Sequence, residues 1–189
     1  MTTLKEIRPL LRRDTQLRRE RLVRAAIELY ASDGFEVPLE KIADRAKVGR
    51  ATLYRNFPDR EALSVAVMEA HLHDLATQVA QWGDRGDAFV LGVRVLANKA
   101  IVSSGLEKIV PLDRQAPSVT RGFRQGVEDI LAAPLARAKA AGLIRADFDI
   151  SNVHRVVLMV AGGGLDSHRR NTAASIEQAL QLLMRGLAP

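Results

Sequence analysis

The chain has 189 residues, no cysteine, a net charge of +6, and 47% apolar but only 4% aromatic residues. This composition supports one or two domains with a buried core, favours helices over sheets, and excludes disulfides and thiolate metal sites. No apolar run reaches the roughly 18 residues of a membrane span. The basic N-terminus also lacks the apolar core of a signal peptide, so we expect a cytoplasmic protein.

The positive charge is concentrated near the N-terminus. Residues 1–60 carry 14 Lys and Arg against 9 Asp and Glu, a net charge of +5, whereas residues 61–189 carry 14 against 13. A basic segment ahead of a helical unit is typical of proteins that bind an anionic polymer, although a solvated terminus has the same composition. We interpret residues 1–14 as a basic arm, with nucleic acid as a candidate partner.

The first third of the chain predicts four helices in quick succession. Helical periodicity and capping signals place them at 15–33, from 38, at about 50–57, and from 59 towards Trp82. The remainder predicts further helices at 87–104, 119–141, about 152–167 and about 173–186. No segment alternates with period 2. We therefore predict an all-α fold of about nine helices, with a three-helix helix-turn-helix domain over 15–60 and a larger helical domain over 61–189.

Residues 39–57 have the anatomy of a helix-turn-helix. Ile42, Val48 and Leu53 are spaced to form a small core between two helices, and Ala43 is small where the helices would cross. The second helix would lie in the major groove of DNA and expose Arg50, Ala51, Thr52 and Arg55. From the residues alone, the alternative is an ordinary helical hairpin with a solvated basic face.

The segment IADRAKVGRATLYRNFPDREAL, at 42–63, resembles the DNA-binding signature of the TetR family of transcriptional regulators. The resemblance begins at Arg21 and includes Ala25-Ala26, Leu29-Tyr30, Gly34-Phe35, Ile42-Ala43, Ala46, Val48, Thr52-Leu53-Tyr54, Phe57 and Glu61-Ala62-Leu63. It implies a homodimer that binds double-stranded operator DNA through paired helix-turn-helix units. Most such proteins are repressors that a small ligand, bound in the C-terminal domain, releases from DNA.

The resemblance also implies roles for individual residues. It places Arg50, Ala51 and Thr52 near bases and phosphates, and Tyr54 and Arg60 at the DNA backbone. The expected DNA-binding residues are Lys41, Lys47, Gly49, Arg50, Ala51, Thr52, Tyr54, Arg55 and Arg60, together with Arg12, Arg13, Arg18 and Arg19 near the N-terminus.

Three departures from the family pattern lie in this unit. Pro38-Leu39 removes a side-chain cap from the second helix, and Lys47 replaces a common turn glycine. A lysine there in the left-handed conformation costs about 1 kcal/mol. Arg50-Ala51 alters the reading face, so the operator sequence of a relative cannot be transferred.

In the C-terminal domain the resemblance implies an effector pocket and a dimer interface formed by the last two helices. Arg94 and Asn98 share one face of a largely apolar helix and could orient a ligand, although a partner or surface contact is the favoured alternative. The candidate pocket residues are Phe89, Arg94, Asn98, Phe123, Val127 and Met159. The candidate interface residues are Val156, Val157, Val160, Gly163, Ile176, Leu180, Leu183 and Met184, and packing inside the single chain is the alternative for some of them.

Other chemistries have little support in the sequence. His71 and His73 are two apart on a helix and point away from each other, so we expect no metal and no cofactor. No convergent set of titratable groups predicts an enzyme. The sequence predicts a homodimeric, sequence-specific repressor with a small-molecule effector. The alternatives are a ligand-independent regulator or activator, and a helical architectural protein that binds DNA through charge alone.

Overall fold

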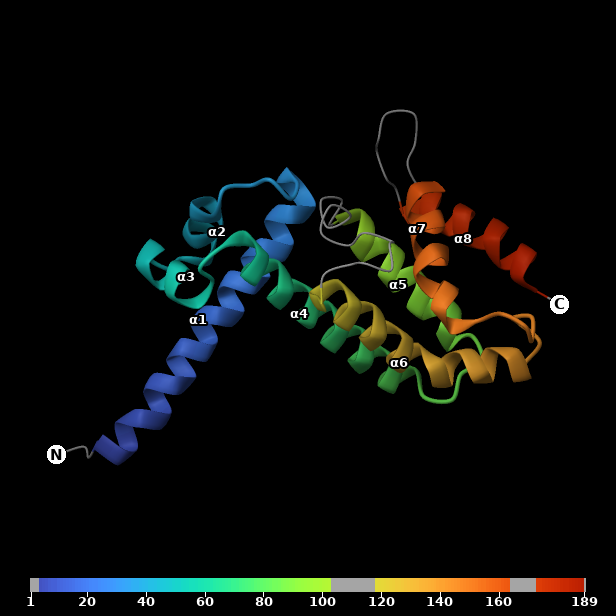
Figure 1. The fold of residues 1–189 in the computed structure, drawn as a ribbon, viewed down its shortest axis with the longest axis horizontal. Coiled ribbons are helices and arrows are strands. Elements are labelled where there is room, and N and C mark those ends of the chain that lie inside the picture. The colour runs from blue at the N-terminus through green and yellow to red at the C-terminus, as the bar shows by residue number, and fades with distance from the viewer. Residues whose placement is uncertain (1–3, 103–117, 164–172, 189) are drawn as a thin grey trace. The chain divides into compact units, whose positions relative to one another are not determined.

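The computed structural model describes residues 4–102, 118–163 and 173–188. Within these ranges the chain forms eight α-helices, one 3₁₀ helix and no strand, which confirms the all-α prediction (Figure 1). Backbone proximity divides the chain into two compact units, Met1–Met68 and Glu69–Pro189. The division falls later than residue 60 because the first turns of α4 carry the buried residues Leu63, Ser64 and Val67.

The first unit contains α1 (Leu4–Asp33), α2 (Leu39–Ala46), α3 (Arg50–Asn56) and the start of α4 (Arg60–Trp82). Helix α1 begins at Leu4 and not at Thr15, so the expected arm at 1–14 is largely the first turns of a 30-residue helix. Its residues include good helix formers such as Leu, Lys, Glu and Arg, and the helix continues through Pro9. Residues 4–14 are therefore helical and continuous with the rest of α1.

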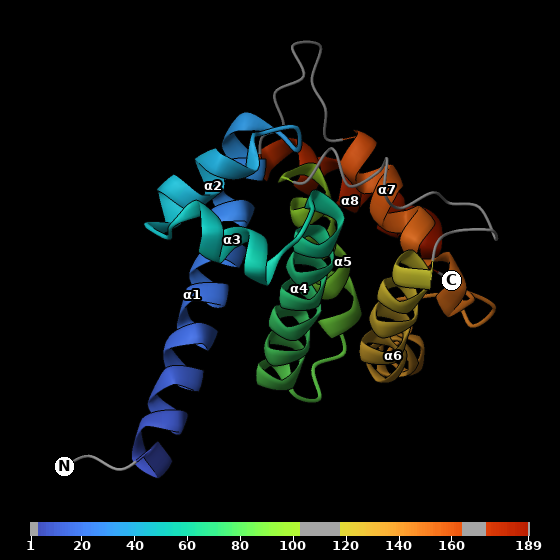
Figure 2. The same ribbon diagram turned by 60° about the vertical axis from the view of Figure 1, so that its left-hand side comes forward.

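Helices α2 and α3 pack together against α1 (Figures 1 and 2). Leu22 and Ala26 of α1, Ile42 of α2 and Leu53 of α3 are fully buried there. Val48, in the turn, is also buried, so the predicted small core between the two helices is confirmed. This core fixes which face of α3 is left to solvent.

The ends of these helices follow the expected signals. Gly34 ends α1 with a φ of 86°, a left-handed conformation that glycine adopts without strain. Asp59 precedes α4, and its Oδ1 accepts a hydrogen bond of 2.8 Å from the backbone N–H of Ala62. Pro38 precedes α2 and makes no side-chain cap, as predicted.

The second unit contains the rest of α4, then α5 (Ala88–Val102), α6 (Ser118–Ala140), the 3₁₀ helix η2 (Ile150–Asn152), α7 (Val153–Gly163) and α8 (Ala173–Leu187). Helix α5 contacts α6, α7 and α8 (Figures 1 and 2). Its nearly all-apolar sequence is explained by this central position. Asn171 and Thr172, the expected cap of the last helix, lie outside the described residues.

Two glycines allow close helix packing in this unit. A Cβ atom on Gly92 of α5 would lie 2.6 Å from Leu131 Cδ2 of α6, and one on Gly126 of α6 would lie 2.8 Å from Leu72 Cδ1 of α4. Pro134 lies inside α6. The helix ends shortly before Gly142, which has a left-handed φ of 68°. The N–H of Leu143 donates a hydrogen bond of 2.9 Å to the carbonyl of Ala138, which gives this carbonyl at the end of α6 a partner.

Candidate nucleic-acid interface

The turn between α2 and α3 is built around Lys47. Lys47 has φ 54° and ψ 47°, so this turn position is left-handed. The N–H of Val48 donates to the carbonyl of Ala43 over 2.9 Å, and the N–H of Lys47 donates to the carbonyl of Asp44 over 3.0 Å. These bonds end α2, and Gly49 then precedes α3 in an extended conformation. The turn therefore holds α3 at a fixed angle to α2.

Helix α3 presents one polar face to solvent. Arg50, Ala51, Tyr54 and Arg55 are exposed, Thr52 is half-buried, and Leu53 anchors the opposite face in the core. The guanidinium of Arg55 is held on its own helix, where Nη2 donates to Thr52 Oγ1 over 3.0 Å and Nε donates to the carbonyl of Ala51 over 3.1 Å. Arg50 makes no hydrogen bond or ion pair with any residue that the structure describes. Its guanidinium is thus available to an external acceptor.

Tyr54 has a partner that sequence reasoning missed. Its hydroxyl donates to Oε1 of Glu40, in the first turn of α2, over 2.6 Å. The hydrogen bond from Tyr54 lowers the pKa of Glu40, and the carboxylate raises the pKa of Tyr54. The two residues are 14 apart in sequence, so only the crossing of α2 and α3 brings them together.

Arg60 is engaged within the first unit. Its Nη1 donates to the carbonyl of Phe35 over 2.5 Å, and its guanidinium carbon lies 5.4 Å from the centre of the Phe35 ring. Burial raises the pKa of Tyr30, and the nearby Ser64 hydroxyl and Arg60 charge oppose that rise. Arg60 therefore links α4 to the Gly34-Phe35 turn in the free protein. Its contact with phosphate remains a prediction.

The other expected basic residues differ in how they are held. Lys41 pairs with Asp33, and Arg18 pairs with Asp14 on the same helix. The guanidinium of Arg19 stacks 5.2 Å from the centre of the Phe57 ring. Such exposed ion pairs are screened by water and exchange easily, so they leave these residues able to turn to a phosphate. Of Arg12 and Arg13 the structure describes only the helical backbone.

The predicted pocket residues occupy different environments in the second unit. Phe89 and Val127 are buried in the core of the second unit. Nε of Arg94 pairs with Oε2 of Glu177 on α8 over 2.8 Å, and Asn98 is exposed and donates to the carbonyl of Arg94. Phe123 packs against the core, whereas Met159 is 59% exposed. Arg94 thus makes an ion pair at the surface of its own chain, which agrees with the surface-contact alternative. Helical periodicity could not show this, because α5 is covered by other helices on several sides.

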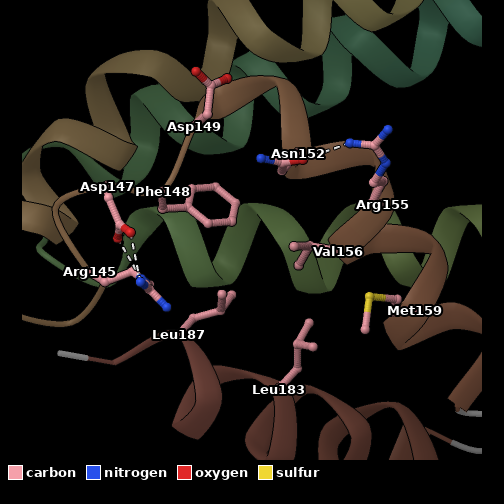
Figure 3. A pocket seen from close by; sticks show the side chains of 10 residues that line it. All are labelled: Arg145, Asp147, Phe148, Asp149, Asn152, Arg155, Val156, Met159, Leu183 and Leu187. Atoms are coloured by element: carbon pink, nitrogen blue, oxygen red, sulfur yellow. Dashed lines mark hydrogen bonds and ion pairs between the residues drawn. The ribbon is translucent and has the colours of Figure 1, made fainter.

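A groove of about 460 Å³ lies elsewhere in the second unit, open to solvent between η2, α7 and the end of α8 (Figure 3). Phe148, Val156, Met159, Leu183 and Leu187 provide its apolar side chains. Its polar rim consists of Arg145 paired with Asp147, Arg155 bonded to Asn152, and Asp149. Met159 is the one predicted pocket residue that lines it. The sequence could not reveal this groove, because it depends on how α8 lies beside α7.

The predicted dimer residues occupy two different environments. Five of them have at most 8% of their surface exposed and lie in the core of the single chain: Val156, Val157, Val160, Ile176 and Leu180. The apolar surface of these five is covered by their own chain, which agrees with the alternative of packing inside the single chain. Leu183 and Met184 are half-buried against the same core, and Gly163 ends α7. Leu182, which was not predicted, is 64% exposed on α8.

His71 is buried and His154 is half-buried, and each lies against a polar neighbour of its own chain. Nζ of Lys99 lies 3.4 Å from Nδ1 of His71 and 2.6 Å from Oδ2 of Asp74. Burial lowers the pKa of His71 to about 4, and it lowers the pKa of His154 to about 4 as well. Both imidazoles are therefore neutral at pH 7. The described part of the chain contains no group of three residues able to hold a metal ion.

None of the helices in the described ranges combines the length and apolar character needed to cross a membrane. This finding concerns the described helices only.

Comparison with known proteins assigns both units. The family described as bacterial regulatory proteins, tetR family, matches residues 22–67, and the family described as transcriptional regulator SbtR-like, C-terminal domain, matches residues 84–189. The matched segments contain α2, α3 and nearly all of the second unit. The first match ends at residue 67, next to the structural division after Met68, and the second begins at residue 84, after the end of α4.

Individual relatives agree with this assignment. The HTH-type transcriptional regulator Rv2250c of Mycobacterium tuberculosis is 28% identical over 156 residues, which are 78% of this chain and 79% of that protein. The TetR transcriptional regulator SCO0520 of Streptomyces coelicolor has a TM-score of 0.68 at 28% identity, covering 90% of this chain and 98% of its own. A TetR transcription regulatory protein of Mycobacterium vanbaalenii has a TM-score of 0.67 at 28% identity, and the match covers 95% of this chain and 99% of that protein. The chain thus belongs to the TetR family of DNA-binding transcriptional regulators, a family that is not enzymatic.

Proposed function

We propose that the chain is a homodimeric, cytoplasmic repressor that reads an operator through α3 and leaves it when a small effector binds the second unit. The observation that carries this proposal is the exposed face of α3. Leu53 and the left-handed turn at Lys47 fix the helix, while Arg50 projects a guanidinium without an internal partner among the described residues. A rigid helix with a free bidentate donor is suited to reading base edges in the major groove.

The size of α3 supports a dimer. Its seven residues span about 10 Å, which matches roughly three base pairs. One bidentate arginine contact discriminates by about 1–3 kcal/mol, too little to select one site in a genome. Two copies of α3, reading half-sites about one helical turn apart, would double the recognised length.

Release by an effector is supported by the fold. The regulator FadR of Bacillus subtilis, at 16% identity and a TM-score of 0.61, has been solved in complex with stearoyl-CoA. That ligand belongs to FadR and suggests only that this fold can hold an effector. An effector that binds one separation of the two α3 helices better than another would shift the dimer between DNA-binding and released states.

Activation is a second candidate. Over 65 residues, 34% of this chain and 30% of that protein, the sequence is 35% identical to the HTH-type transcriptional activator FasR of Mycolicibacterium smegmatis. The two candidates share the same DNA-reading surface. They differ in where the operator lies relative to the promoter, which transcription from a reporter with the operator placed upstream or overlapping would decide.

Selection from a pool of randomised duplexes tests whether the chain binds DNA in a sequence-specific way. We expect the natural chain to recover one motif with two-fold symmetric half-sites. An R50A variant run in parallel should recover a motif without preference at one position of each half-site. Recovery of random sequences by the natural chain would support an architectural protein that binds DNA through charge alone.

A further inference from the structure

The hydrogen bond between Tyr54 and Glu40 lies on the surface that we assign to DNA. Tyr54 is 44% exposed on α3 and Glu40 is half-buried at the start of α2, and their oxygens are 2.6 Å apart. Because the pKa of Glu40 is lowered and that of Tyr54 is raised, a neutral hydroxyl donates to a charged carboxylate at pH 7. Hydrogen bonds to a charged acceptor are shorter and stronger than those between neutral groups.

A tyrosine hydroxyl carries one hydrogen, so it donates to one strong acceptor at a time. The role expected of Tyr54 is to donate that hydrogen to a phosphate oxygen of DNA. Glu40 already holds it in the free protein. The carboxylate and the phosphate are therefore competing acceptors for the same hydrogen, and both are negatively charged.

Among the described residues no cation forms an ion pair with Glu40. Lys41 lies against Asp33, and Arg55 is bonded to Ala51 and Thr52 on its own helix. Arg50 and Arg60 act on Glu40 through their charge, which lowers its pKa. In the described part of the chain, Tyr54 is the only side chain that donates a hydrogen bond to the Glu40 carboxylate.

We propose that Glu40 sets the DNA affinity of this surface by holding the Tyr54 hydroxyl away from the phosphate that the hydroxyl would otherwise bind. The inference rests on the proposed function only in requiring that α3 meets DNA. In the natural chain the Tyr54 hydroxyl then contributes little to binding. Removal of the Glu40 carboxylate transfers the hydroxyl to the phosphate and also removes a repulsive charge from the interface.

A double-mutant cycle separates these contributions. The proteins are the natural chain, E40A, Y54F and the E40A/Y54F double variant, and the probe is a fluorescent duplex of scrambled sequence at fixed salt. A scrambled duplex suffices because phosphate contacts carry no sequence information. We expect E40A to bind about three- to tenfold more tightly. We expect Y54F to weaken binding less than about twofold in the natural background but to abolish most of the gain in the E40A background.

Two results would overturn the inference. If E40A tightens binding equally in the natural and the Y54F backgrounds, the carboxylate acts through its charge alone. If E40A weakens binding, Glu40 positions Tyr54 for DNA and does not compete for it. Should E40A unfold, as judged by circular dichroism, E40Q permits the same cycle, since it removes the charge and keeps a weaker acceptor.

The cycle also distinguishes this inference from the proposed function. If the natural chain binds all duplexes equally, sequence-specific regulation fails, yet the cycle can still be measured on the scrambled duplex. If the natural chain selects a motif but the cycle is additive, only the role of Glu40 fails. If none of the four proteins binds any duplex, both are contradicted.

Discussion

Replacement of Lys47 by glycine is predicted to stabilise the fold and weaken DNA binding in the same molecule. Lys47 is the one non-glycine residue in the described ranges with a positive φ, and its side chain is exposed. The hydrogen bonds of this turn use backbone atoms, so they survive the substitution. The expected effects therefore come from the backbone conformation and from the removal of a charge, and they can be worked out separately.

The stability effect follows from the left-handed conformation. A residue with a Cβ atom costs about 1–2 kcal/mol more than glycine at φ 54° and ψ 47°. The greater freedom of glycine in the unfolded chain offsets about 0.4–1 kcal/mol of this gain. We expect Lys47→Gly to raise the free energy of unfolding by about 0.5–1 kcal/mol, measured as a higher urea midpoint with an unchanged slope.

Lys47→Ala is the matched control. Alanine removes the same charge but keeps a Cβ atom, so its stability should stay close to that of lysine. Both variants should lose DNA affinity equally and flatten the dependence of log affinity on log salt by about 0.9, the value for one phosphate contact. A glycine variant no more stable than the alanine variant would refute the strain argument. Unchanged salt slopes in both would refute the contact between Lys47 and phosphate.

Three other predictions concern α3, α1 and the second unit. Arg50→Lys should keep the charge but lose the bidentate geometry. In competition with base-substituted duplexes, the variant should show about 1–3 kcal/mol less discrimination at one position of each half-site. Undiminished discrimination would contradict the role of Arg50 in base reading. Deletion of residues 1–14 should flatten the salt slope by roughly one unit for each phosphate that these residues bind, and an unchanged slope would show that the start of α1 does not meet DNA. The pKa of His71 is about 4 in the folded protein and 6.5 in the unfolded chain, so folding favours the neutral imidazole. The stability that this group contributes is therefore present above pH 6.5 and is lost as the pH falls towards 4. Urea unfolding at pH 7.5 and pH 5 should show a loss of about 2 kcal/mol from this group, and H71Q, which leaves Lys99 paired with Asp74, should lose less; an equal loss in both proteins would contradict the assignment to His71.

The helix-turn-helix could be predicted in detail because its signals are local. The left-handed turn at Lys47 follows from the position of a family glycine, and the cap at Asp59 follows from residue type. The spacing of Ile42, Val48 and Leu53 was enough to predict the core between α2 and α3. The start of α1 was misplaced because residues 4–14 are rich in basic residues and contain Pro9, which disfavours a helix interior, although α1 continues through it.

The second unit was harder to predict because its signals are not local. Helices α5, α7 and α8 are apolar on more than one side, so periodicity cannot say whether Val160 or Leu180 faces its own core or a partner. The pairing of Arg94 with Glu177 joins residues far apart in the chain. The same limit hid the bond between Glu40 and Tyr54, although both residues lie in the segment whose fold was predicted best.

The ratio of affinities for two duplexes decides whether the chain reads DNA sequence or binds DNA through charge alone. It compares the dissociation constants of the natural chain for a duplex recovered by selection and for a scrambled duplex of the same composition, at one salt concentration near physiological. We expect the selected duplex to bind at least about 10³-fold more tightly. Equal dissociation constants for the two duplexes would contradict this expectation, and would leave a helical protein that binds DNA through charge alone.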